Sequence, residues 1–394
     1  MLFLLLLIIL DFKMGKQIIN TFILFYICLI FIDCKKPFTP ELNQTDVNVL
    51  VVEGYIDGSD TISFKLSRSR KIYPGDTAVS KNELHARITI EDNQRHTYPL
   101  IESGNGLYRS NGILNLSPVY QYRLHFFTSD GKEYLSDFVP YKVSPPIDSV
   151  GWELLNGGVQ VYVNTHDVNN KTRYYRWEYS ETWQFHSRYN SILQYDPVTD
   201  KVVYRTESIY MCWRSNNSSS IIIGSTAKLA NDVLSKGPIV YISYPDNRLS
   251  VLYSILVKQY PLDENGYNYL LALKSNTENT GSISDPQPSQ TSGNIHNLSN
   301  PSERIIGYVS AGNHLEQRMF ISARSLTSDW FEPVSCSLDS YPFGKEREDF
   351  NYTGLVPVDY DYGSGSSPLG YLASSRTCVD CTLFGTTTKP SFWP

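Results

Sequence analysis

The sequence predicts a mainly β fold. An N-terminal immunoglobulin-like or transthyretin-like β-sandwich is expected over residues 47–146, and a larger β-rich domain with one or two short helices over residues 147–394. Short segments alternate apolar and polar residues with the two-residue period of a half-buried strand. Gly, Pro, Asn and Asp separate these segments at close intervals. Tyrosine, which favours pleated, half-buried surfaces, is abundant with 29 copies.

The strands of the first domain follow one another closely. TISFKLSRSR places apolar Ile62, Phe64 and Leu66 at alternate positions, as expected for a strand with one buried face. LVVEGYIDG, HARITIED and VYQYRLHFF have a similar pattern. Asp130-Gly131 predicts a hairpin turn, and Pro145-Pro146 marks the end of the domain.

The second domain combines strands with candidate helices and loops. Asn156-Gly157-Gly158 predicts a hairpin, and the aromatic segment YYRWEYSETWQFH predicts a strand with Tyr175 and Trp177 on one face. A short helix is expected over residues 226–234. A longer one is expected from an N-cap at Asp263 to about residue 276. The segment that follows this helix is rich in Ser, Asn, Gly and Pro, and we expect it to form a long loop over residues 279–301.

The N-terminus resembles a bacterial lipoprotein signal. Eleven of the twelve residues from Phe22 to Asp33 are apolar, and the run stops at Cys34. A basic start followed by an apolar core fits best if translation begins at Met14, although Met1 stays open. We therefore expect a signal peptide over residues 1–33, lipid attachment at Cys34 and a tether over residues 34–46. An uncleaved transmembrane anchor is the alternative.

Charge and cysteine content limit the possible partners and chemistry. The net charge is −6 without a basic block, which argues against a nucleic-acid partner. Beyond the signal and Cys34, four cysteines remain, and an even number in an exported protein favours disulfides. The sequence leaves the pairing open among three arrangements of Cys212, Cys336, Cys378 and Cys381. The single CxxC at Cys378 to Cys381 is weak support for a redox or metal site.

No catalytic motif stands out along the chain. The seven histidines form neither HExxH nor another metal-spaced pair, and there is no GxSxG elbow, P-loop or GxGxxG after a strand. We therefore expect a protein that is not an enzyme and has no cofactor and no metal. A hydrolase with a discontinuous Ser-His-Asp site is the remaining enzymatic hypothesis.

Several unusual segments occur in a familiar order. They are Cys34 with PFTP, LVVEGYI, YYRWEYSETWQFHS, YSILVKQY, NTENTGSISDPQPSQTSGNI, IIGYVSA and CVDCTLFG with KPSFW. In this order the chain resembles a Bacteroidetes outer-membrane lipoprotein family that carries a domain of unknown function. Asp33, where a small residue is preferred, and Lys35-Lys36, where acidic residues are common, depart from such lipoproteins.

The resemblance implies a place beside a TonB-dependent outer-membrane receptor, because such lipoproteins are often encoded next to one. It suggests an accessory or substrate-capturing lid in nutrient uptake, anchored to the outer membrane by lipid on Cys34, with the face of that membrane left open. An independent ligand-binding or adhesion lipoprotein is the alternative. The candidate contact residues come from the polar loop and the aromatic strand: Asp285, Gln287, Gln290, Asn294, Trp177 and Trp183. We expect a disulfide-held tail at the C-terminus.

Overall fold

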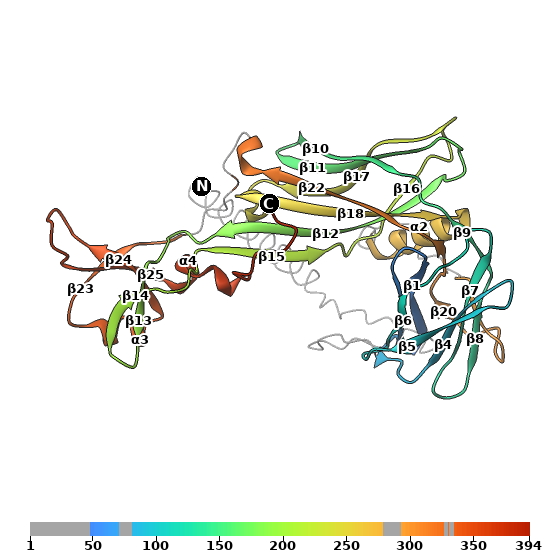
Figure 1. The fold of residues 1–394 in the computed structure, drawn as a ribbon, viewed down its shortest axis with the longest axis horizontal. Helices are drawn as coiled ribbons and strands as arrows, with labels where there is room; N and C mark the ends of the chain where they lie inside the picture. Colours follow the sequence, from blue (N-terminus) through green and yellow to red (C-terminus); the bar gives the residue numbers. More distant parts are fainter. Residues whose placement is uncertain (1–47, 71–80, 279–292, 327–329, 331–334) are drawn as a thin grey trace, which may run out of the picture. The chain divides into compact units, whose positions relative to one another are not determined.

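The computed structural model describes residues 48–70, 81–278, 293–326, 330 and 335–394. These residues belong to one compact unit, Asn48–Pro394. The predicted signal, Cys34 and the tether lie outside the described residues, as do Asp285, Gln287 and Gln290. No helix in the described part is long and apolar enough to cross a membrane. The strands dominate (Figure 1), which confirms the mainly β class.

The first region is built on one hydrogen-bonded sheet of 12 strands. Its members before residue 143 are β1 (Leu50–Asp57), β2 (Thr61–Arg68), β3 (Lys81–Asn82), β4 (Arg87–Asp92), β5 (Thr97–Glu102), β6 (Leu107–Ile113), β7 (Gln121–Phe127), β8 (Glu133–Ser136) and β9 (Val139–Lys142). Alternate side chains point to the core, so that Ile62, Phe64 and Leu66 are fully buried. The predicted turn at Asp130-Gly131 joins β7 to β8.

Three strands from much later in the chain complete this region. They are β19 (Ile295–Asn297), β20 (Ile305–Ile306) and β21 (Ala311–Gly312). β19 pairs with β8, whereas β20 and β21 pair in parallel with β1. Through β21 and β9 the path β7–β4–β5–β6–β2–β1 returns to β7 and closes on itself. Most of the strands expected to form the first sandwich thus lie on one closed circuit, to which β3 and β8 are attached at β2 and β7. The circuit also uses residues beyond the predicted boundary at 146.

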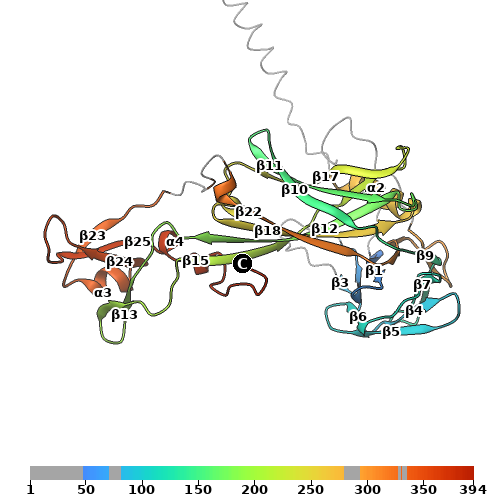
Figure 2. The same cartoon turned by 45° about the horizontal axis from the view of Figure 1, so that its top comes forward.

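Two further sheets pack face to face (Figures 1 and 2). One contains β10 (Ile147–Leu155), β11 (Gly158–Asp167) and β17 (Asp232–Ser243). The other contains β12 (Tyr174–His186), β15 (Met211–Asn217), β16 (Ile222–Ser225), β18 (Leu252–Leu262) and β22 (Leu315–Ser322). Their shared core includes Val161 from one sheet and Trp177 and Ile255 from the other. The predicted hairpin joins β10 to β11, with Asn156 and Gly157 at positive φ.

Smaller elements form the remainder of the chain. The strands are β13 (Leu193–Asp196), β14 (Lys201–Tyr204), β23 (Asp339–Pro342), β24 (Leu355–Asp361) and β25 (Gly370–Ser375). The helices are α2 (Glu264–Glu278), α3 (Glu346–Asn351) and α4 (Arg376–Val379), with 3₁₀ turns η2 (Asn247–Leu249), η3 (Ala323–Ser325) and η4 (Cys381–Leu383). β23, β25 and β24 form one sheet, and Leu193 of β13 shares a core with Phe350 of α3.

The structure tests the expected helices directly. α2 begins as predicted, because the Asp263 side chain accepts a hydrogen bond of 2.6 Å from the backbone N–H of Gly266. The helix expected over 226–234 is wrong. There, Thr226 and Asp232 hydrogen-bond to each other through their side chains, and Asp232 already begins strand β17. This buried pair fixes a turn in place of a helix.

Candidate functional site

The long strand β12 changes its role along its length. Odd-numbered side chains share one face. At the start of the strand this face is buried core, with Tyr175 fully buried and Trp177 only 2 % exposed. Figure 1 shows β12 continuing beyond β10 and β11. There the same face carries Glu181, Trp183 and Phe185, which line an open pocket. The sheet of β10, β11 and β17 covers only the first part of β12. The extent of this covering sheet, more than the sequence of β12, therefore decides which of its side chains line the pocket.

The pocket has a volume of about 590 Å³. We call it the β12–β15 pocket. It is lined by segments from β12, β15, the η2 turn and the disulfide-bonded C-terminal region: Glu181, Trp183, Phe185, His186, Ser187, Arg188, Arg214, Asn216, Pro245, Asp246, Asn247, Arg248, Cys336, Thr377, Cys378, Cys381 and Phe384. This size and mixture of aromatic and polar side chains are typical of small-molecule sites.

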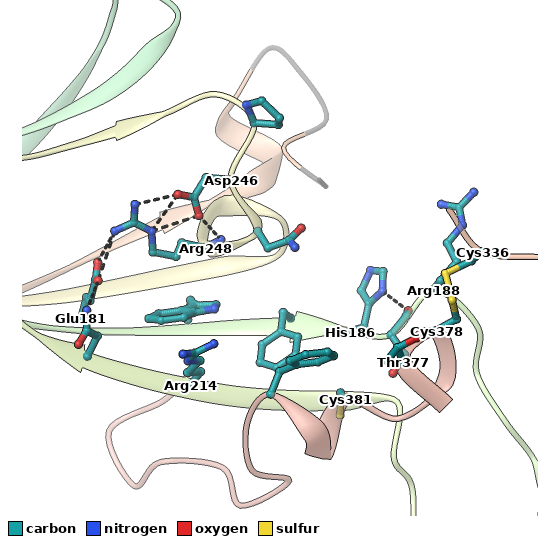
Figure 3. A pocket seen from close by; sticks show the side chains of 17 residues that line it. Glu181, His186, Arg188, Arg214, Asp246, Arg248, Cys336, Thr377, Cys378 and Cys381 are labelled. Atoms are coloured by element: carbon teal, nitrogen blue, oxygen red, sulfur yellow. Dashed lines mark hydrogen bonds and ion pairs between the residues drawn. A yellow bond between two sulfur atoms is a disulfide. The ribbon is translucent and has the colours of Figure 1, made fainter. Parts of the chain in front are cut away.

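A buried ionic network closes one end of the pocket (Figure 3). The Glu181 carboxylate, with a side chain only 2 % exposed, accepts hydrogen bonds from Arg248 Nη1 at 3.1 Å and from the Tyr253 hydroxyl at 2.8 Å. Arg248 Nη2 and Nε donate to Asp246 at 2.7 and 3.1 Å. Burial would lower the pKa of Arg248, but these hydrogen bonds and both carboxylates raise it overall. All three guanidinium nitrogens are thereby committed to protein groups.

Arg214 enters the pocket from the neighbouring strand. It is the register partner of Trp183 on β15, and its guanidinium carbon lies 5.8 Å from the centroid of the indole ring. A cation at this distance is attracted to the ring face. Figure 3 shows the Arg214 side chain between the Glu181 network and Cys381. The side chain is exposed, in contrast to the committed Arg248.

Two disulfides fix the opposite end of the pocket. Cys212 pairs with Cys381, and Cys336 pairs with Cys378. The two cysteines of the CxxC segment therefore bond to different partners, as expected for structural disulfides and not for a dithiol redox pair. Three of the four cysteines line the pocket. The predicted disulfide-held tail thus contributes a wall of the site.

Comparison with known protein families gives a match. Residues 35–318 match the family described as Domain of unknown function (DUF4249). The chain belongs to this family. A search of curated proteins gives no match. The DUF4249 match includes β12, β15 and the η2 turn, whereas the disulfide partners Cys336, Cys378 and Cys381 follow it.

The structure places the predicted contact residues of this DUF4249 chain in different surroundings: one lines the pocket and two are buried. Trp183 lines the β12–β15 pocket. Trp177 does not, because its ring is in the core and its Nε1 donates to the Gln259 side chain at 3.0 Å. Asn294 is 5 % exposed, and its amide bonds the backbone of Val309 on both sides. Burial thus corrects the assignment of Trp177 and Asn294 as contact residues.

The predicted loop also needs a correction. Residues 279–292 lie outside the described part, but the segment from 295 to 297 forms β19 and pairs with β8. Ile295 and Asn297 are buried there. The sequence pattern did not predict this short strand, because its neighbours are mostly Ser, Asn and Gly and Ile295 is the one strongly apolar residue of the strand.

Sequence reasoning missed Arg214, Arg248 and Asp246. A lone arginine on a strand is ordinary surface chemistry, and nothing in the segment around Asp246 predicts that Arg248 reaches a strand 67 residues earlier.

A Ser, His and Asp group does occur in the DUF4249 fold, between β1 and β21. His314 Nδ1 lies 2.6 Å from Asp57 Oδ2 and 3.0 Å from Ser59 Oγ. In a catalytic triad the acid and the nucleophile use different ring nitrogens. Here both share Nδ1, and the Ser59 hydroxyl donates to Asp57 at 2.6 Å. The arrangement stabilises the fold and is unsuited to proton relay. Among the described residues, no group of His, Cys, Asp and Glu could hold a metal.

The environment of Asp57 leads us to expect that the stability of the fold depends on pH in the acid range. Burial raises the pKa of its carboxyl, but hydrogen bonds from His314 and Ser59 outweigh this, so the folded pKa is lowered. A lowered pKa contributes stability above the unfolded value of about 3.9, and that stability is lost as the pH falls through the folded value. We expect the difference in unfolding free energy between wild type and Asp57→Asn to shrink below about pH 4.

Urea unfolding at pH 6, 4 and 3 measures this difference. Asp60→Asn, which changes an exposed carboxylate three residues later, is the matched control. An unchanged gap between wild type and Asp57→Asn from pH 6 to pH 3 would contradict the assignment.

Proposed function

We propose that the protein is a non-enzymatic, lipid-anchored outer-membrane protein that captures a small ligand for a TonB-dependent transporter. The β12–β15 pocket is the observation that carries this proposal. It is open, of ligand size, and combines the aromatic ring of Trp183 with the exposed guanidinium of Arg214. Its walls are fixed by two disulfides and by the Glu181 network, so little ordering would be needed on binding.

The membrane and transporter parts of the proposal rest on the sequence. The apolar run ending at Cys34 supports a lipid anchor, and the resemblance to lipoproteins encoded beside TonB-dependent receptors supports the partner. Membership in a family of unknown function is compatible with this role and adds no activity of its own.

An independent ligand-binding or adhesion lipoprotein is the second candidate. The same pocket supports it, because capture needs no transporter. A hydrolase has weaker support, since the Asp57, Ser59 and His314 group lacks the geometry of a triad.

Co-purification separates the first two functions. We expect affinity-tagged protein, extracted in mild detergent from its native host, to bring down a β-barrel receptor. A control preparation from the same membranes, with an unrelated tagged lipoprotein, measures non-specific recovery. Equal recovery of receptor from both would leave the independent binding function.

Lipid attachment has its own test. Cells grown with radioactive palmitate are expected to label the wild-type protein, and Cys34→Ala is expected to lose the label completely. Cys28→Ala, which changes the other cysteine of the N-terminal segment, is the matched control. Equal labelling of wild type and Cys34→Ala would contradict the anchor.

A further inference from the structure

The charge balance of the β12–β15 pocket points to an acidic ligand. Three arginines, Arg188, Arg214 and Arg248, line it together with two carboxylates, Glu181 and Asp246. Both carboxylates are bound by Arg248. We propose that the pocket binds a small ligand with one carboxylate and a flat apolar face, and that Arg214 pairs with the carboxylate. This inference rests on the proposed capture function and names its ligand class.

Arg214 is suited to this role by what surrounds it. In the part of the chain that the structure describes, its guanidinium is joined to no carboxylate and contacts the ring of Trp183. A guanidinium offers a planar fork of N–H donors that matches a carboxylate in two parallel hydrogen bonds. The charge of Arg248 is already balanced by Glu181 and Asp246. Arg214 is therefore the arginine next to Trp183 whose charge is available to pair with a ligand carboxylate.

The same balance favours a monoanion over a phosphate dianion. The formal charges of the three arginines and two carboxylates that line the pocket sum to +1. One added carboxylate neutralises this excess, whereas a dianion would leave a net negative charge beside Glu181 and Asp246. Like charges in a partly desolvated site are unfavourable.

Trp183 supplies the surface for the rest of the ligand. Its ring is half-buried and faces the pocket on the strand next to Arg214. Indole faces bind the C–H face of a sugar ring or another aromatic ring. With about 590 Å³ available, the site suits a molecule of disaccharide or dipeptide size. A uronate sugar and a peptide with a free C-terminal carboxylate share the required chemistry.

Two acid and neutral pairs distinguish these sources. The full chain, purified in mild detergent, is titrated calorimetrically at low salt with glucuronosyl-xylose, a disaccharide with one carboxylate, and with its methyl ester. It is titrated separately with N-acetyl-alanyl-phenylalanine and with the C-terminal amide of that peptide, so that the carboxylate is the charged group in each acid and each partner is uncharged. We expect one acid to bind at least tenfold more tightly than its neutral partner. The pair that shows the difference identifies the source of the carboxylate.

Variants assign the difference to Arg214. Arg214→Gln is expected to reduce the acid-to-neutral ratio to about one, and Arg214→Lys to retain part of it. Arg87→Gln is the matched control, because Arg87 is also exposed and lies 5.0 Å above an aromatic ring, that of Phe127. Trp183→Ala is expected to weaken acid and neutral forms by a similar factor. Thermal unfolding of each variant checks that the fold is kept.

The outcomes separate this inference from the proposed function. Equal binding of acid and neutral forms would overturn the carboxylate assignment and leave ligand capture intact. A ratio unchanged in Arg214→Gln would overturn the role of Arg214, and binding of neither acid would overturn the ligand class. Acid binding without receptor in the co-purification would remove the transporter role alone.

Discussion

Replacing Glu181 with alanine is expected to lower the free energy of unfolding by about 3–5 kcal/mol. The Glu181 carboxylate is almost fully buried and joins Arg248 and the Tyr253 hydroxyl. Burial, together with the charge of Glu181, also holds the pKa of Tyr253 well above its ordinary value. Removing the carboxylate leaves a buried hydroxyl and part of a guanidinium without acceptors, which costs more than the pair itself contributes. Urea unfolding at neutral pH measures the loss.

Two variants test this explanation. Glu178→Ala removes the same residue type from the same strand, but its ion pair with Arg176 is 46 % exposed at the glutamate, so a change below about 1 kcal/mol is expected. Glu181→Leu combined with Arg248→Met removes both charges and is expected to recover most of the loss. Equal losses at Glu178 and Glu181 would show that burial does not set the cost.

Removing the Cys212–Cys381 disulfide by serine substitution of both cysteines is expected to lower the free energy of unfolding by about 4–5 kcal/mol. The bond joins residues 169 positions apart, and closing a long loop removes much entropy from the unfolded chain. The tail after α4 would then be held by contacts such as the backbone bridge between Trp213 and Thr386 and the hydrogen bond from Trp393 to Gln184.

The second disulfide supplies the matched comparison. Cys336 and Cys378 are 42 positions apart, so their paired replacement by serine is expected to cost about 1 kcal/mol less. Urea unfolding of both double variants under non-oxidising conditions measures the difference. A larger loss at the shorter loop would contradict the loop-length explanation and point to local packing in the pocket wall.

Local patterns carried most of the fold prediction. Alternation identified the strands from Ile62 to Leu66 and through Trp177, and turn chemistry placed the hairpin at Asn156-Gly157. The cap at Asp263 located α2. Each of these signals lies within a few residues of the element that it predicts. The prediction therefore does not depend on which distant segments pack against that element.

The β12–β15 pocket is formed by contacts between segments that are distant in the sequence, and local sequence patterns do not predict it. The alternation that buries Trp177 also exposes Trp183 to the pocket, and only the extent of the covering sheet distinguishes them. Arg248 reaches Glu181 through the η2 turn. The disulfide pairing likewise follows from the position of the tail, which no spacing of cysteines determines.

The late strands of the first circuit have a consequence for how the chain is made. A ribosome delivers Leu50 long before Ile305, its parallel partner in β20. Until then β1 keeps an open edge, and open edges recruit strands from other chains. The nascent protein must therefore be shielded over most of its length, and fragments that stop before residue 312 should aggregate when expressed alone.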